Sequence, residues 1–127
     1  MIGGKVLDAS ALAWLARRRP AALAWFDTAR LVGIALYLPS LALAEVRAVR
    51  PDAAPILADL LSHPSVVLGE FDSATADRVD QLLLAANVFD ALAGHVVHVA
   101  RQRGWPALTA DPGRLHRIHP TLEVDLL

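Results

Sequence analysis

Four acidic residues that lie far apart in the chain are candidates for chemistry: Asp8, Glu45, Asp90 and Asp111. Asp8, Asp90 and Asp111 stand where one predicted element gives way to the next, and Glu45 lies about one turn into a predicted helix. Two carboxylates about 5 Å apart repel by roughly 3 kcal/mol at an effective dielectric constant near 20, so four in one pocket would strain the fold or take up protons. A divalent cation would relieve that repulsion, and all-oxygen ligands suit Mg²⁺ or Mn²⁺. Because such an ion can activate water and stabilise charge on a phosphate, these residues indicate phosphodiester hydrolysis.

The elements that would position these acids alternate along the chain. Apolar stretches predict strands at 5–7, 33–38, 65–68, 106–110 and 122–126, and helices at 11–19, 20–30, 41–50, 54–61, 73–86 and 90–104, with one helical turn around 114. This alternation predicts an α/β fold, a three-layer α/β/α sandwich around a parallel sheet of about five strands. Because the chain shows no repeat or linker, residues 1–127 are expected to form a single domain.

In a parallel sheet with right-handed crossovers, all strands end at one edge, and binding sites lie there. Asp8 and Asp111 directly follow predicted strands, and Asp90 opens a helix that must run back from the same edge. Glu45 lies about one turn into a helix that leaves this edge, with Ser40 as its predicted N-cap. The four acids are therefore candidates for one pocket.

Each acid also has a purely structural interpretation. Asp8 and Asp90 could be helix N-caps, and Asp111, which precedes Pro-Gly, could stabilise a turn. Glu45 is harder to explain in this way, because an unpaired charge on an apolar helix face would be costly. Its neighbours at i−4, i−1 and i+3 are Leu41, Ala44 and Ala48. If the acids repel one another, Asp→Asn changes in the pocket should stabilise the metal-free protein.

The composition limits the possible functions. The 127 residues are 55% hydrophobic, include no cysteine, and carry a formal net charge of −1. Disulfide frameworks and thiolate metal sites are thereby excluded, and the small net charge argues against gripping nucleic acid by bulk electrostatics. No apolar run reaches about 18 residues without a charge or proline, so neither secretion nor membrane insertion is expected, and a cytoplasmic location is the simplest assumption.

Four segments together resemble the motifs of PIN-domain ribonucleases of the VapC toxin type. They are Val6-Leu7-Asp8-Ala9-Ser10, Pro39-Ser40 with Ala44-Glu45-Val46, Asp90-Ala91-Leu92 with His98-Val99-Ala100, and Pro106 to Asp111 with its Thr109-Ala110-Asp111 end. By this resemblance Asp8, Glu45, Asp90 and Asp111 match the family's catalytic, metal-binding quartet, and Ser10 and Thr109 match supporting hydroxyls. Gly3-Gly4, which shortens the first strand, and His95, where the family is usually apolar or small, depart from the pattern.

The resemblance implies a Mg²⁺- or Mn²⁺-dependent endoribonuclease, the toxin half of a toxin-antitoxin pair. Such toxins are usually dimeric and are held inactive by a VapB-type antitoxin, so a homodimer or a complex with antitoxin is expected. An amphipathic antitoxin helix could lie on the apolar helix at 41–50 with an arginine aimed at the acids. Arg47 and Arg50, on the same helix as Glu45, could contact RNA phosphates or simply solvate that helix.

Other interpretations remain open. A PIN-like scaffold could use the same groove for a partner without useful catalysis. A phosphotransfer domain could also place acids at strand ends, but Ala9 and Ser10 stand where its second acid is usually found, and its late-strand lysine is missing. His95 and His98, three residues apart, could form a metal pair but have no evident third nitrogen ligand. A Ser10, His98, Asp90 relay would lack a nucleophile elbow.

Overall fold

The computed structural model describes residues 3–127. Its strands are β1 (Gly4–Leu7), β2 (Ala35–Pro39), β3 (Val66–Gly69), β4 (Ala107–Thr109) and β5 (Val124–Leu126). Its helices are α1 (Ala9–Ala16), α2 (Pro20–Val32), α3 (Ser40–Val49), α4 (Ala54–Leu61), α5 (Ser73–Ala86), α6 (Ala91–Arg103) and α7 (Pro112–His116), with a short 3-10 turn at Pro51–Ala53 before α4. The alternation expected from the sequence is present.

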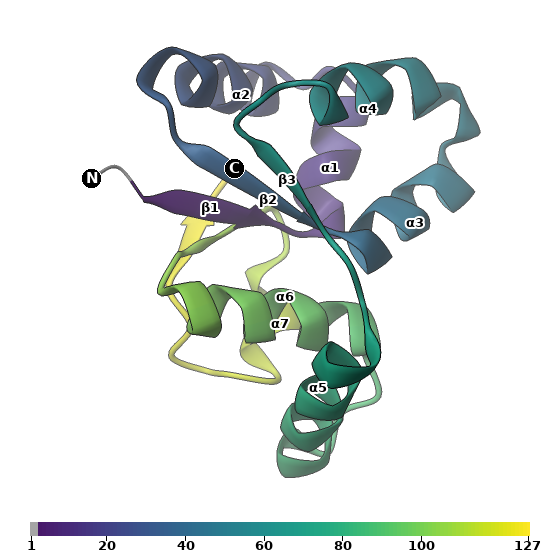
Figure 1. Ribbon diagram of the computed structural model, residues 1–127, viewed down its shortest axis with the longest axis vertical. Helices are drawn as coiled ribbons and strands as arrows, with labels where there is room; N and C mark the ends of the chain where they lie inside the picture. The colour runs from purple at the N-terminus through teal and green to yellow at the C-terminus, as the bar shows by residue number, and fades with distance from the viewer. Residues whose placement is uncertain (1–2) are drawn as a thin grey trace.

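All five strands are parallel and lie in the order β3-β2-β1-β4-β5. Figure 1 shows α1, α2 and α4 on one side of this sheet and α6 and α7 on the other, while α5 projects away from the sheet below α6. The predicted α/β sandwich with five parallel strands is confirmed. Because the connections after β1 and after β3 lead to opposite sides of β1, the sheet has a topological switch point between β1 and β4.

Helix α6 is the most deeply buried helix of the fold. It contacts β1, β2 and β4, and its side chains from Leu92 to Val97 are all buried. Gly104, at φ 67°, ends it in a left-handed cap, where a side chain would add strain. Within residues 3–127 no single helix is long and apolar enough to span a membrane; α5 and α6 pass that test only as a pair, bent by 106°.

Two helix boundaries differ from those expected. Helix α1 runs from Ala9 to Ala16, whereas 11–19 was expected, because Arg18 adopts a left-handed conformation with φ 55° that stops the helix before Pro20. The prediction that Ser40 caps α3 is wrong. Ser40 is the first residue of the helix, and Pro39 holds the cap position without a side-chain hydrogen bond. The fixed φ of Pro39 lets β2 pass directly into the helix, which leaves no residue between them for a cap.

Candidate active site

The switch point between β1 and β4 brings two of the four acids to one edge of the sheet. Leu7 of β1 pairs with Leu108 of β4, and Asp8 and Asp111 follow these two neighbouring strands within a few residues. The amide of Asp8 also donates to the carbonyl of Leu108 at 3.4 Å. The crevice outside the carboxyl ends of strands at such a point is where open α/β sheets bind ligands.

Asp8 is buried, with 2% of its surface exposed, and its carboxylate accepts three hydrogen bonds. Oδ1 accepts from the Ser10 hydroxyl at 2.6 Å and from the Ala11 amide at 2.9 Å, and Oδ2 accepts from the Thr109 hydroxyl. The two hydroxyl oxygens lie 3.1 Å apart and accept in turn from the amides of Ala110 and Asp111, both at 2.8 Å. Ser10 and Thr109 thus fix Asp8 and join the ends of β1 and β4.

Burial dominates the protonation of Asp8. It raises the pKa of this carboxyl above its ordinary value, while the hydroxyls of Ser10 and Thr109, the amide of Ala11 and the positive charge of Arg114 oppose the shift. Desolvation disfavours the charged form of an acid, so a second cation near Asp8 would reduce this cost. Asp8 is the N-cap of α1, as its structural interpretation predicted, and it is also a buried acid whose charge is incompletely compensated.

Arg114 joins two other acids of the quartet. Its Nε and Nη2 donate to Asp90 at 2.8 and 3.0 Å, and its Nη1 and Nη2 donate to Glu45 at 3.1 and 3.3 Å. Such a fork of parallel hydrogen bonds is the geometry in which guanidinium binds carboxylates most strongly. Elements from three parts of the chain, α3, the start of α6 and α7, therefore meet around one cation.

Asp90 is also the N-cap of α6, accepting from the amide of Ala93 at 3.2 Å. Partial burial raises the pKa of Asp90, but the hydrogen bonds from Arg114 and Ala93 and the charges of Arg114 and Arg117 outweigh it, and the pKa lies below its ordinary value. The same hydrogen bonds act on Arg114 in the opposite direction: they raise its pKa, with a smaller contribution from Glu45. The pair is therefore charged throughout the physiological pH range.

The quartet does not form a finished ligand set in this arrangement. Among residues 3–127, no three His, Cys, Asp or Glu side chains lie close enough together to hold a metal ion. Asp111 precedes α7 with an exposed carboxylate that makes no hydrogen bond within the described chain, so the turn-stabilising interpretation of this residue has no contact behind it. Glu45 is 42% exposed, and Arg114 is the cationic partner of its charge.

The remaining candidate residues differ in their pairing and burial. Arg50 is paired with Asp52 at 2.9 Å, whereas Arg47 is exposed and forms no ion pair among residues 3–127. His95 is completely buried in α6, with neither ring nitrogen hydrogen-bonded within the described residues and its ring 5.1 Å from that of Phe71. Burial lowers the pKa of His95 to about 4, with His98 contributing and Asp72 opposing.

Sequence reasoning did not place Arg114 among the acids. The available signal was its place, three residues after Asp111, in the short helix that leaves the same edge of the sheet. An arginine there has the reach to fold back over the acids. We had expected an arginine among these acids only from a partner, and the chain itself supplies one.

A groove leads from the acids between α1 and α3. It has a volume of about 260 Å³ and a wall of small apolar side chains, among them Ala9, Ala13, Val46 and Val49. Glu45 and Arg114 also line it, together with Ser10, Arg17 and Arg50. Val49 is 70% exposed, which leaves an apolar side chain in water at the outer end of α3. The groove could therefore accept an apolar segment beside the acids.

Comparison with known proteins bears on this arrangement. A family model described as PIN domain matches residues 5–119. Among curated protein sequences, no significant match to this chain was found. Solved structures share the fold, among them VapBC2 from Rickettsia felis bound to a DNA fragment from their promoter. Its TM-score is 0.71, with 15% identity over 100% of this chain and 99% of that one.

Two further solved structures are FitAB complexes. FitAB bound to an IR36 DNA fragment is similar with TM-score 0.69 and 20% identity, covering 99% of this chain and 94% of that one. FitAcB from Neisseria gonorrhoeae is similar with TM-score 0.67 and 21% identity, covering 100% of this chain and 96% of that one. At these identities the likeness concerns the fold, which extends over the whole length of the chain.

Proposed function

This chain belongs to the PIN domain family, and we propose that it is a cytoplasmic endoribonuclease toxin that a cognate antitoxin neutralises. One observation carries the proposal. At the switch point of the sheet, a single cation, Arg114, binds Asp90 and Glu45 together. Burial raises the pKa of Asp8, and the charge of Arg114 is among the causes that oppose this rise. A position where two carboxylates share one cation, and where the charge of that cation also acts on a buried third acid, is suited to hold a divalent ion and an RNA phosphate.

The residues present fit Mg²⁺ or Mn²⁺. The carboxylates of Asp8, Glu45, Asp90 and Asp111 would hold the ion, and all four are oxygen donors of the kind these ions prefer. The Arg114 guanidinium is a stand-in that already offsets the charge of Asp90 and Glu45. When bound, the ion would activate water and stabilise negative charge on the phosphate.

The chain's own residues prepare this site. Ser10 and Thr109 hold the Asp8 carboxylate in one orientation, so that no rearrangement of β1 against β4 is needed when the site is used. Arg114 keeps Asp90 and Glu45 from repelling each other in the metal-free protein. Because Arg114 and a divalent ion would use the same oxygens, the arginine must release at least one acid before the site is complete. Its side chain would then be free to bind substrate phosphate.

The antitoxin would occupy the groove between α1 and α3. The related folds come from VapBC2 and FitAB complexes, and the groove offers the apolar wall that an amphipathic helix requires. An antitoxin arginine reaching Glu45 or Asp90 would compete for the acids that Arg114 binds, and would keep the ligand set incomplete. The antitoxin would then inhibit in the same way that Arg114 does in the free chain, by a guanidinium group that binds the acids in place of the metal ion.

Cleavage of RNA by the purified protein tests this function. We expect Mg²⁺- or Mn²⁺-dependent cleavage that stops in chelator and is abolished by Asp8→Asn. The matched control is Asp72→Asn, because Asp72 caps α5 through the amide of Thr75 at 2.8 Å and is not one of the four acids. Equal loss of activity in both variants, or cleavage retained by Asp8→Asn, would contradict the proposal.

The second candidate is a PIN-like scaffold that binds a partner without useful catalysis. It is favoured by one observation, that Arg114 already satisfies two of the acids. Expression of the chain without an antitoxin separates the candidates. Growth arrest that Asp90→Asn relieves supports the enzyme, whereas arrest that persists in Asp90→Asn supports the scaffold.

A further inference from the structure

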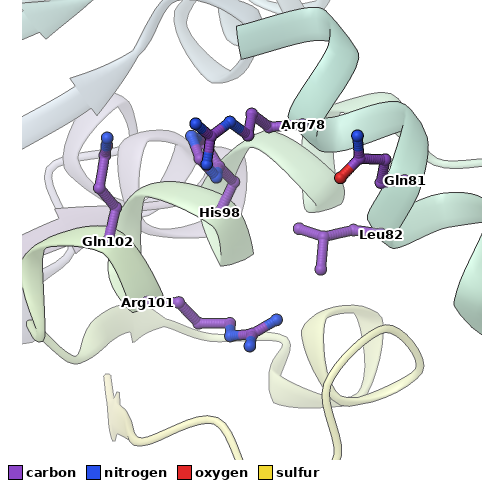
Figure 2. A pocket seen from close by; sticks show the side chains of 6 residues that line it. All are labelled: Arg78, Gln81, Leu82, His98, Arg101 and Gln102. Carbon is purple, nitrogen blue, oxygen red and sulfur yellow. The ribbon is translucent and has the colours of Figure 1, made fainter.

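A second groove lies in the angle between α5 and α6, and none of the four acids lines it (Figure 2). Its walls are one face of each helix: Arg78, Gln81 and Leu82 from α5, and His98, Arg101 and Gln102 from α6. Each helix contributes residues at positions i, i+3 and i+4, the spacing that places side chains on the same side. The groove has a volume of about 460 Å³, within the range of about 300–1,000 Å³ typical of ligand sites.

The α5–α6 groove carries positive charge that nothing in its walls offsets. Arg78 and Arg101 line it, no carboxylate does, and neither arginine forms an ion pair among residues 3–127. The groove between α2 and α4 is different, because its Arg18 and Arg30 share the walls with two acids, Asp27 and Asp59. A local basic site thus exists in a protein whose net charge is −1.

The pKa of His98 also reflects the positive charge of this groove. It is partly buried, which lowers its pKa, and the charges of Arg78 and Arg101 lower the pKa further. Figure 2 shows Arg78 next to His98 and Arg101 one turn further along α6. An anion placed among these three side chains would counter their mutual repulsion and would accept hydrogen bonds from both guanidinium groups.

The two helices that form the walls of the α5–α6 groove pack closely against each other. Gly94 of α6 faces Val79 of α5, and a Cβ at Gly94 would lie 2.7 Å from the Val79 side chain. The absence of that atom lets the two helices pack closely beside Arg78, the residue before Val79. This packing sets the separation of the two helix backbones that carry Arg78 and Arg101.

We propose that the α5–α6 groove binds the phosphate backbone of single-stranded RNA next to the cleavage site. The identity of the ligand as RNA rests on the proposed function. Asp90 caps the start of α6, and His98 lies eight residues further along the helix, a distance of about 12 Å. A strand held at the acids could therefore continue along α6 to the groove within a few nucleotides. Gln81 and Gln102 add amide donors and acceptors for ribose or base edges.

Fluorescence anisotropy with a labelled single-stranded RNA tests the proposal in chelator, where no cleavage takes place. The groove variant is Arg78→Gln with Arg101→Gln, and the matched control is Arg18→Gln with Arg30→Gln, which removes the same charge from the other groove. We expect the groove variant to raise the Kd at least about tenfold. Its salt dependence should fall by a slope of about 1.4, since each contact to a single strand contributes about 0.7. The control should stay within about twofold of wild type.

An equal effect of the two double variants would assign RNA binding to bulk charge and overturn the proposal, as would unchanged binding by the groove variant. A groove variant that alters the oligomeric state while binding RNA normally would assign the groove to a contact between copies, and would also overturn it. The binding measurement requires no cleavage. If the protein does not cleave RNA but its RNA binding still depends on the groove, the proposed activity is wrong and the RNA site stands. If the protein cleaves RNA but its binding does not depend on the groove, the activity stands and the RNA site is wrong.

Discussion

Arg114 and Asp90 form a two-point contact, 2.8 Å from Nε to Oδ2 and 3.0 Å from Nη2 to Oδ1, at the edge where the strands end. The remaining donors of Arg114 reach Glu45. The cation that holds two of the four acids together is therefore part of the chain. It stabilises the metal-free fold and at the same time opposes the entry of a divalent ion, so stability and metal affinity should respond in opposite directions when it is removed.

Arg114→Gln should separate these two effects. The metal-free protein should lose about 1–2 kcal/mol, or roughly 3–6 °C in Tm, because Asp90 and Glu45 lose their shared partner. Mn²⁺ should bind more tightly, because no guanidinium competes for the oxygens. Calorimetry in chelator and titration with Mn²⁺ measure the two quantities.

Arg117→Gln is the matched control for that experiment, since Arg117 is 61% exposed and touches Asp90 only at 3.5 Å. The free energy of unfolding of Arg117→Gln should change by no more than about 0.5 kcal/mol, as is usual for surface substitutions. If Arg114→Gln leaves both stability and Mn²⁺ affinity at wild-type values, the contact has no energetic importance.

The acids should differ in their effect on stability. Asp8→Asn should stabilise the metal-free protein at neutral pH by about 1 kcal/mol, because it removes a buried charge whose pKa is raised by desolvation. The gain should vanish as the pH falls below the ordinary aspartate value of 3.8, where the carboxyl is neutral in both states. Asp90→Asn should instead destabilise, because it leaves Arg114 with a weaker partner. Thermal melts in chelator at pH 7 and pH 3.5 compare them.

The expectation that Asn would stabilise at every acidic position in the pocket is therefore replaced. That expectation assumed that the carboxylates repel one another with no cation between them. In the structure, Arg114 binds both Asp90 and Glu45 and offsets their charge. A gain in Tm for Asp90→Asn would restore the original expectation and would show that the ion pair contributes less than the acids' repulsion costs.

His95 should make the fold sensitive to acid. Its pKa of about 4 in the folded protein is below the ordinary value of 6.5, so the unfolded chain binds a proton more readily between these values. Stability that is present above pH 6.5 should be lost as the pH falls toward 4. His95→Leu, of similar size and without unpaired nitrogens, should raise Tm at pH 7 and flatten the decline between pH 6.5 and 4.5. Melts across that range that stay parallel for the two proteins would contradict this account.

The groove between α1 and α3 gives a prediction about the partner. Val49→Asp places a charge on its exposed apolar wall and should weaken antitoxin binding by at least about tenfold, equivalent to 1.4 kcal/mol, without reducing RNA cleavage. Leu84→Asp is the control, because Leu84 is 75% exposed on α5 and lies outside this groove. Co-purification and titration with the antitoxin distinguish the variants; equal binding by both would place the antitoxin elsewhere.

The sheet and its edge followed from the sequence because short-range signals define them. Alternating apolar strands and helices, Asp90 before a helix and Gly104 after it are local features, and the handedness of crossovers then sends Asp8 and Asp111 to one edge. The start of α3 was misplaced by one residue because Pro39 belongs to both β2 and the cap position. Such a boundary depends on backbone geometry that residue types alone leave open.

The occupant of the site could not be read from the sequence. Whether Arg114 points to solvent or to Asp90 depends on the packing of α7 against α6, a tertiary contact between elements separated by β4. The exposure of Glu45 depends in the same way on how much of α3 remains uncovered. Residue types and spacing defined the possible ligands, and packing decided which of them are already paired.

Titration of the metal-free protein with Mn²⁺ in a calorimeter tests most directly whether these acids share a divalent ion. We predict saturable binding by wild type and by Asp72→Asn, and an affinity at least about tenfold weaker in Asp90→Asn, a difference of about 1.4 kcal/mol. Indistinguishable binding by all three proteins, or no binding by any of them, would contradict the account.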